Sequence, residues 1–134
     1  MTRTLLLLVF FGLLTSCTRN KDEISPGLVG SWKLIESLAD PGDGSGTYQA
    51  VEDGKIIEFT ADNTIISRGT FCLPDTVSAV PRVVATYSVN DSIIIPMDCE
   101  SGWNTHFELM GPYLILSNPY CIEPCLQKYA RIDH

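Results

Sequence analysis

Residues 104–117 read NTHFELMGPYLILS, and they are the clearest indication of fold class in this 134-residue chain. Phe107 and Leu109 alternate with polar neighbours before Gly111-Pro112, and Leu114 and Leu116 continue the apolar set after it. Alternation with a period of two is typical of a β-strand that buries one face. Glycine and proline together suit a tight turn, so the stretch predicts two antiparallel strands, 104–110 and 113–117, joined as a hairpin.

The same pattern extends on both sides of this hairpin. From Leu28 onward, short runs of β-branched and aromatic residues are bounded by Gly, Pro, Asn and Asp, and none of them has a helical period. Further strands are predicted at 30–38, 55–60, 64–71, 82–89, 92–97 and 126–132. We therefore expect an all-β domain with eight strands.

The connections between these strands alternate between short and long. The turns at 61–63, 90–91 and 111–112 are hairpin-sized, whereas 39–54, 72–81, 98–103 and 118–125 are long loops. If successive strands are antiparallel neighbours, all tight turns lie at one end and all long loops at the other. An open sheet would expose two unpaired edges, so we predict an eight-stranded antiparallel up-and-down β-barrel, with a two-sheet β-sandwich as the alternative. The predicted interior consists of Trp32, Leu34, Ile57, Phe59, Val83, Ala85, Tyr87, Val89, Phe107, Leu109, Leu114 and Leu116.

The N-terminus has the features of a targeting segment. Arg3 precedes a short apolar run, and Leu-Thr-Ser leads directly into Cys17, which resembles the lipobox of bacterial lipoproteins. The resemblance implies a signal peptide at 1–16, a lipidated Cys17, and a polar tether over 17–27 ahead of a domain at 28–132. It also implies a lipid anchor in the cell envelope, and Thr18 favours the outer membrane, on its periplasmic face or at the cell surface. An ordinary secretory peptide is the alternative.

The charge balance limits the partners that the domain can have. The formal net charge is -7, with 16 acidic and 9 basic residues. A chain this acidic lacks the basic footprint that nucleic acid requires. We expect contact with the membrane only through the lipid, and we expect a monomer.

Four cysteines remain after Cys17, namely Cys72, Cys99, Cys121 and Cys125. An even number in an oxidising compartment indicates disulfides, and four cysteines allow three pairings among which the sequence does not choose. We favour Cys72 with Cys99 and Cys121 with Cys125, because the second pair is close in sequence and Pro124 helps to turn the chain. A zinc site and a redox pair are the alternatives, although the chain has no Cys-x-x-Cys motif. All four cysteines are expected at the long-loop end.

The stretch Gly30-Ser31-Trp32 opens the first predicted strand. Gly-x-Trp at this place, the segments LVGSWKLIE, ADPGDGSG and CIEPCLQKY, and the meander of residues 28–132 resemble the lipocalin-like lipoproteins of Gram-negative bacteria. The resemblance implies a barrel that is closed at the Trp32 end. It also implies that a basic residue of the last strand, here Arg131, packs across Trp32 by a cation-π contact.

The long-loop end is the candidate binding site. Tyr48, Phe71, Trp103 and Tyr120 fall in or beside these loops, so the leading hypothesis is a barrel mouth that binds a small apolar ligand. The second hypothesis is a filled barrel that serves as a structural or interaction protein of the envelope. We expect no enzyme, no catalytic residue, no metal and no cofactor. His106 is expected to face outward, His134 ends the chain, and Asp98 and Glu100 are expected in a solvated loop.

Residues 40–46, Asp-Pro-Gly-Asp-Gly-Ser-Gly, leave calcium binding by residues 40–52 open. Asp43, Ser45, Gly46 and Glu52 fit part of a twelve-residue calcium loop, but Pro41 stands where its first acid belongs. The segment is expected at the mouth, where it either covers a cavity or caps a filled barrel.

Overall fold

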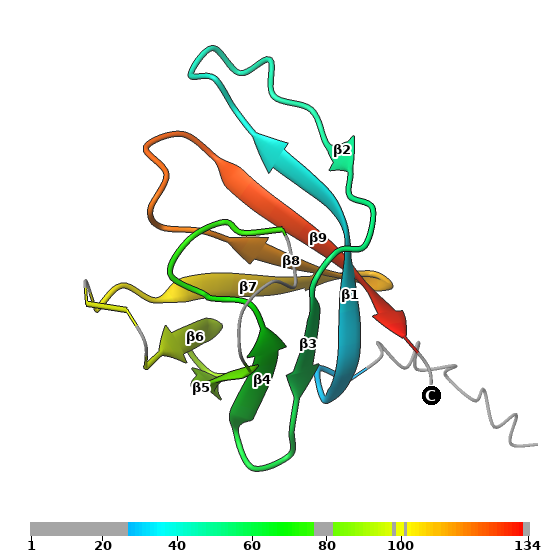
Figure 1. Ribbon diagram of the computed structural model, residues 1–134, viewed down its shortest axis with the longest axis vertical. Helices are drawn as coiled ribbons and strands as arrows, with labels where there is room; N and C mark the ends of the chain where they lie inside the picture. The colour runs from blue at the N-terminus through cyan, green and yellow to red at the C-terminus, as the bar shows by residue number, and fades with distance from the viewer. Residues whose placement is uncertain (1–26, 77–81, 98, 101, 133–134) are drawn as a thin grey trace, which may run out of the picture.

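The structure is a computed structural model that describes residues 27–76, 82–97, 99–100 and 102–132. The expected signal peptide and Cys17, together with Asp98 and His134, lie outside these residues. Among the residues described, no helix is long and apolar enough to cross a membrane. The strands are β1 (Gly30–Ala39), β2 (Gln49–Ala50), β3 (Ile56–Phe59), β4 (Thr64–Arg68), β5 (Arg82–Ser88), β6 (Ile93–Pro96), β7 (Thr105–Met110), β8 (Tyr113–Ser117) and β9 (Cys125–Ile132) (Figure 1).

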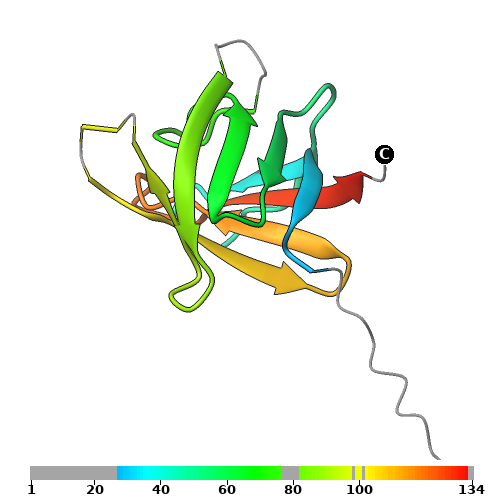
Figure 2. The same cartoon turned by 90° about the horizontal axis from the view of Figure 1, so that it is seen from below.

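The strands form a closed antiparallel barrel of eight strands with one additional short strand. Each strand from β3 to β9 pairs with the next, and β1 closes the ring by pairing with both β3 and β9. Figure 2 shows the strands arranged around a common interior. The predicted barrel is therefore confirmed, and the sandwich alternative is not the structure.

The additional strand β2 lies within the long loop that was expected after the first strand. It pairs with Glu36 and Ser37 of β1. The same edge of β1 pairs with β3 at residues 30–33. Gly54 separates β2 from β3 and passes so close to β1 that an added Cβ would lie 2.1 Å from the carbonyl oxygen of Leu34. Only glycine fits this crossing without moving the backbone.

The three short turns lie at one end of the barrel, as predicted, because all neighbouring strands are antiparallel. Asn63, Ser92 and Gly111 have positive φ values of 61°, 55° and 59° in these turns. Such values suit two-residue and three-residue hairpins, whose twist matches that of the strands. We call this end of the barrel the hairpin end and the opposite end the rim.

Two of the predictions about individual strands are wrong. The strand predicted at 64–71 ends at Arg68, because Gly69 adopts a φ of 143° and turns the chain toward the barrel interior. Val89 was expected inside, but it lies in the turn after β5 with 59% of its surface exposed.

The core is largely the predicted one. The buried apolar residues are Trp32, Leu34, Ile57, Phe59, Ile65, Phe71, Ala85, Tyr87, Ile94, Phe107, Leu114, Leu116 and Tyr129, with Val83 and Leu109 partly buried against them. Near the hairpin end, Phe59 makes edge-to-face contacts with Tyr87 and Phe107 at centroid distances of 4.9 and 5.8 Å. The Tyr87 hydroxyl donates to the carbonyl oxygen of Thr60 at 2.5 Å, so this polar group is satisfied without opening the core.

Candidate functional site

Trp32 closes the hairpin end of the barrel. Its indole is fully buried, and its Nε1 donates to the carbonyl oxygen of Leu28 at 3.0 Å. The guanidinium of Arg131 lies 5.5 Å from the ring centroid and donates to the carbonyl oxygens of Gly27 and Val29 at 2.6 and 2.7 Å. Gly30 makes room for it, because an added Cβ would lie 2.7 Å from Arg131 Nη2. This is the cation-π contact that the resemblance implies.

The half of the interior nearer the rim has a different chemistry. Its inward-facing residues include Lys55, Ser67, Thr105, Gln127 and Tyr129, all of them buried. We call this group the polar interior. Ser67 Oγ and Thr105 Oγ1 have no hydrogen-bond partner within the part of the chain that the structure describes. Buried hydroxyls without hydrogen-bond partners destabilise a fold. The half of the interior near the rim is therefore less favourable for stability than the half near the hairpin end, where aromatic side chains pack.

Lys55 is the most unusual member of the polar interior. It is 1% exposed, its Nζ donates to the carbonyl oxygen of Thr70 at 3.2 Å, and the same atom lies 5.7 Å from the ring centroid of Phe71. Burial lowers the pKa of Lys55 from 10.5 to about 8, and the nearby Asp75 carboxylate opposes part of that shift. The ammonium is therefore held inside the barrel at a cost in solvation.

The segment 69–76, which we call the plug, folds over the polar interior. Figure 1 shows it crossing from the end of β4 toward β9. The carbonyl oxygen of Asp75 accepts a hydrogen bond from Gln127 Nε2 at 3.0 Å, and Gln127 Oε1 accepts one from the Tyr129 hydroxyl at 3.1 Å. Burial raises the pKa of Tyr129 well above its ordinary value, and the Asp75 carboxylate adds to the effect. The plug also inserts Phe71, which is 2% exposed.

These contacts leave the described interior filled. Ser67 is 0% exposed, Thr105 2% and Lys55 1%, so these side chains are closely packed inside the barrel. A ligand cavity of about 300 Å³ or more would expose the side chains that line it. The described residues therefore line no cavity of that size inside this half of the barrel.

Two disulfides hold the rim together. Cys72 bonds to Cys99, and Cys121 bonds to Cys125, at S–S distances of 2.03 Å. The favoured pairing is confirmed. The first disulfide joins the plug to the loop after β6, and the second closes the short loop before β9, so long loops that lack secondary structure are fastened at this end.

The four aromatic residues expected at the mouth lie in three different surroundings. Trp103 and Tyr120 stack with their centroids 5.5 Å apart, and Trp103 is 50% exposed. Phe71 belongs to the core. The ring of Tyr48 lies 5.1 Å from Lys128 Nζ, and this lysine projects from the outer face of β9, where it also bonds to Glu36 at 2.6 Å.

Exposed apolar side chains gather on the loops of the rim. Leu73 is 59% exposed, Met97 74% and Ile122 100%. Together with the Trp103–Tyr120 stack they form what we call the rim surface. The Cys72–Cys99 bond connects the loops that carry Leu73 and Met97, and the aromatic stack connects the next loop to them.

The loop at residues 40–46 is organised by its own first carboxylate. Asp40 accepts hydrogen bonds from the backbone nitrogens of Gly42, Gly44 and Gly46 at 2.7, 3.0 and 2.8 Å. The bond from Gly46, followed by those from Gly42 and Gly44, lowers the pKa of Asp40. No group of three or more His, Cys, Asp or Glu residues that could hold a metal ion occurs among the described residues. The loop is fastened to the rim by the Asp40 nitrogen, which donates to the carbonyl oxygen of Pro124 at 3.0 Å.

The remaining candidates are placed as follows. His106 is exposed on β7, on the outward face, as expected. Glu100 is exposed in the loop between β6 and β7. Lys55 and Ser67 were not predicted as interior residues, although a signal was present. Each is two residues from an inward-facing isoleucine of the same strand region, and residues two apart in a strand share a face.

A scan against protein-family models, a search of curated proteins and a search of solved structures each found no match to this chain.

Proposed function

We propose that this protein is a non-catalytic, lipid-anchored lipoprotein of the cell envelope that contacts a partner protein through the rim surface. The single observation that carries the proposal is the combination of a filled upper barrel with an apolar surface held by disulfides above it. The barrel then acts as a rigid support, and recognition takes place on the loops.

The filled interior is the reason to prefer this function over an apolar ligand inside the barrel. Such a ligand would have to displace Phe71 and would then meet the ammonium of Lys55 and the hydroxyls of Ser67 and Thr105. Placing an alkyl chain against unsatisfied polar groups is unfavourable. The same ligand would meet apolar groups in the half near the hairpin end, but the described residues there are buried and packed against one another.

The rim surface has the properties of a protein-binding site. Aromatic residues and methionine are enriched at protein interfaces, and clustered exposed apolar groups mark interaction sites. Met97 and Trp103 supply these groups on the loop between β6 and β7, and Ile122 supplies one on the loop between β8 and β9. Because the loops are already linked by a disulfide and an aromatic stack, binding would lose little conformational entropy.

The anchor rests on the resemblance of Leu-Thr-Ser-Cys17 to a lipobox. Several acyl chains on one cysteine would hold the protein firmly, since each buried CH₂ contributes about 0.8 kcal/mol. Growth of the native host with an alkyne-labelled fatty acid tests this. The wild-type chain should carry the label and Cys17→Ala should not, whereas equal labelling of both chains would exclude Cys17 as the lipidated residue.

Photo-crosslinking in the native host tests the rim surface. A benzophenone amino acid in place of Trp103 or Ile122 should give a discrete crosslinked species of higher mass. The matched control is the same amino acid in place of Val89, which is also well exposed but lies at the hairpin end. Crosslinks of equal yield at all three positions, or none at Trp103 and Ile122, would contradict a partner site at the rim.

A further inference from the structure

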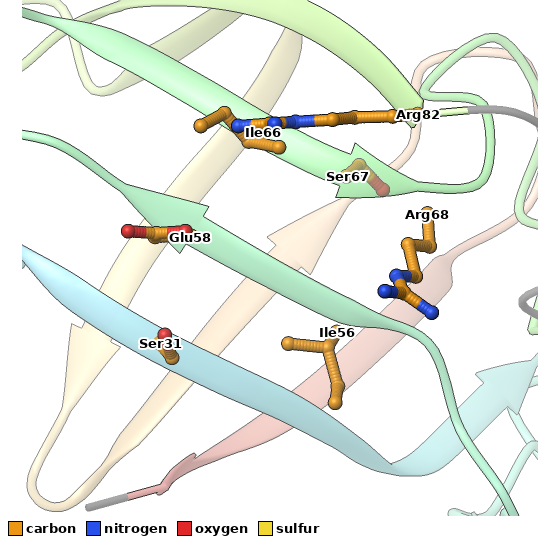
Figure 3. A pocket seen from close by; sticks show the side chains of 7 residues that line it. All are labelled: Ser31, Ile56, Glu58, Ile66, Ser67, Arg68 and Arg82. Atoms are coloured by element: carbon orange, nitrogen blue, oxygen red, sulfur yellow. The ribbon is translucent and has the colours of Figure 1, made fainter. Parts of the chain in front are cut away.

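A hollow lies on the outer wall of the barrel, away from the rim surface. It has a volume of about 490 Å³ and is lined by outward-facing residues of β1, β3, β4 and the start of β5, with Ser67 at its edge. Figure 3 shows their side chains, including Ile56, Glu58, Ile66, Arg68 and Arg82. We call this hollow the outer groove. Its volume falls within the range of small-molecule sites.

The outer groove contains a pair of like charges. Arg68 of β4 and Arg82 of β5 are directly opposite each other in the strand register, and both are exposed. Like charges at such positions repel and destabilise a sheet. Neither arginine has an acidic partner within the described ranges, whereas Lys128 is paired with Glu36 at 2.6 Å. In a chain of net charge -7, two neighbouring cations without a carboxylate between them form a local site for an anion.

The other residues of the groove place apolar side chains and one carboxylate around the two arginines. Ile56 is 39% exposed, and Ile66 lies directly opposite Glu58 in the β3–β4 register. In Figure 3, Glu58 and Arg68 lie at opposite ends of the groove, the Arg68 guanidinium points toward Ile56, and the Arg82 side chain extends along the groove with its guanidinium beside Ile66. An anion between the two guanidinium groups is therefore attracted to both of them, lies away from the Glu58 carboxylate, and has the apolar surface of Ile56 and Ile66 beside it.

The closed barrel excludes one class of ligand from the outer groove, namely a peptide that binds as an added strand. Each of the two strands that form most of the groove is paired on both sides: β3 with β1 and β4, and β4 with β3 and β5. A peptide cannot add to them as a further strand, because that mode of binding requires a free sheet edge. A ligand must therefore be bound by side chains alone. A compact ligand with one anionic group can pair with both arginines without any contact to the backbone.

From this arrangement we propose that the outer groove binds a small amphiphilic anion, a carboxylate or phosphate monoester that bridges Arg68 and Arg82 and lays a short aliphatic part against Ile56 and Ile66. Guanidinium groups bind both anions through paired N–H donors. The proposal goes beyond the rim function and does not depend on it, because no residue is shared between the two surfaces.

Isothermal titration of the full chain in phosphatidylcholine nanodiscs tests the proposal, with hexyl phosphate and hexanoate as probes. Inorganic phosphate and hexanol report the charged and apolar parts separately. We expect one hexyl phosphate per chain, and about tenfold weaker binding for each part alone. The variant R68Q/R82Q should weaken hexyl phosphate binding by about a hundredfold, since it removes two charge-assisted contacts.

A pair of matched variants separates a built site from general electrostatics. Glu58→Gln removes a negative charge from the groove and should tighten hexyl phosphate binding by about threefold. Glu108→Gln removes an exposed negative charge from β7 and should leave binding unchanged. Unaltered affinity in R68Q/R82Q, or equal effects of the two glutamate variants, would overturn the proposal. Binding to phosphatidylglycerol nanodiscs that depends on both arginines would also overturn it, in favour of a lipid headgroup site.

Discussion

The two halves of the barrel interior are built differently. At the hairpin end, Trp32, Phe59, Tyr87 and Phe107 form a continuous apolar core between short turns. At the rim, the interior is polar, the plug closes it, and two disulfides fasten the loops above. The first half is stabilised by burial of large apolar groups, whereas the second depends on hydrogen bonds to loop carbonyls and on covalent links.

This difference separates the half of the barrel that stabilises the fold from the half that carries the proposed binding surface. A core that is complete at one end allows the other end to carry long loops, a buried lysine and exposed aromatic residues without loss of the fold. Loops on a rigid support are also where proteins most often bind their partners. The comparison predicts that equivalent changes in the two halves have unequal effects.

The largest effect is expected from the two tryptophans of the chain, one in each half. Trp32→Ala should lower the free energy of unfolding by about 4 kcal/mol, because it leaves a large cavity in a packed core. Trp103→Ala should cost less than about 1 kcal/mol, because half of that side chain is already in water. Urea denaturation followed by circular dichroism measures both, and similar losses would mean that the rim is as tightly built as the hairpin end.

Removal of the disulfides should come next. The Cys72–Cys99 bond spans 27 residues and the Cys121–Cys125 bond spans 4. Loop entropy alone gives about 3.5 kcal/mol for the longer link and about 2 kcal/mol for the shorter one. Paired alanine variants, C72A/C99A and C121A/C125A, should therefore differ in melting temperature, with the first pair melting lower. The reverse order would show that the plug is held mainly by its hydrogen bonds.

Lys55 should make stability depend on pH. Its pKa is about 8 in the folded chain and 10.5 ordinarily, so the unfolded chain binds more protons between these values. The free energy of unfolding should then rise with pH, by about 2 kcal/mol from about pH 7.5 to pH 9.5. Above about pH 10 the raised pKa of Tyr129 acts in the opposite direction, because the unfolded tyrosine ionises first.

The control for this pH effect is Lys55→Met, which keeps most of the side-chain volume and removes the charge. Denaturation curves of this variant should not show the rise over the same pH interval. A rise of the same size in both chains would assign the effect to another group.

The smallest effect concerns the unpartnered hydroxyls. Thr105→Val replaces a buried hydroxyl by a methyl group of the same shape and should raise the free energy of unfolding by about 1 kcal/mol. Thr86→Val, on the outward face of β5, is the matched control and should change it by less than about 0.5 kcal/mol. If Thr105→Val is instead destabilising, the hydroxyl makes a contact that stabilises the rim half.

Much of the barrel could be predicted because its signals are local. The turn residues near Asn63 and Gly111 and the alternation around Phe107 act over a few neighbours, and they placed the strands to within a few residues. Strand β2 escaped notice because Gln49 and Ala50 are exposed and too few to show a period. Val89 followed the alternation of β5 but stood one residue beyond its end.

The candidate sites were harder to predict because they depend on contacts between distant residues. Phe71 was expected at an open mouth, and only the turn at Gly69 directs it inward onto Lys55. The arginine pair of the outer groove depends on the register of β4 and β5, across a connection of thirteen residues in the sequence. No local pattern marks Arg68 and Arg82 as neighbours.

The sequence by itself determined the all-β class, the order of the strands and the grouping of four cysteines at one end. These features follow from side-chain period and turn chemistry, which act along the chain. Only the tertiary structure decided that the described side chains of the upper interior are buried, that the plug covers a buried lysine, and that two arginines are opposite each other on the outer wall. Those outcomes depend on packing and register between segments that are far apart in sequence, and burial there overrides what each residue prefers alone.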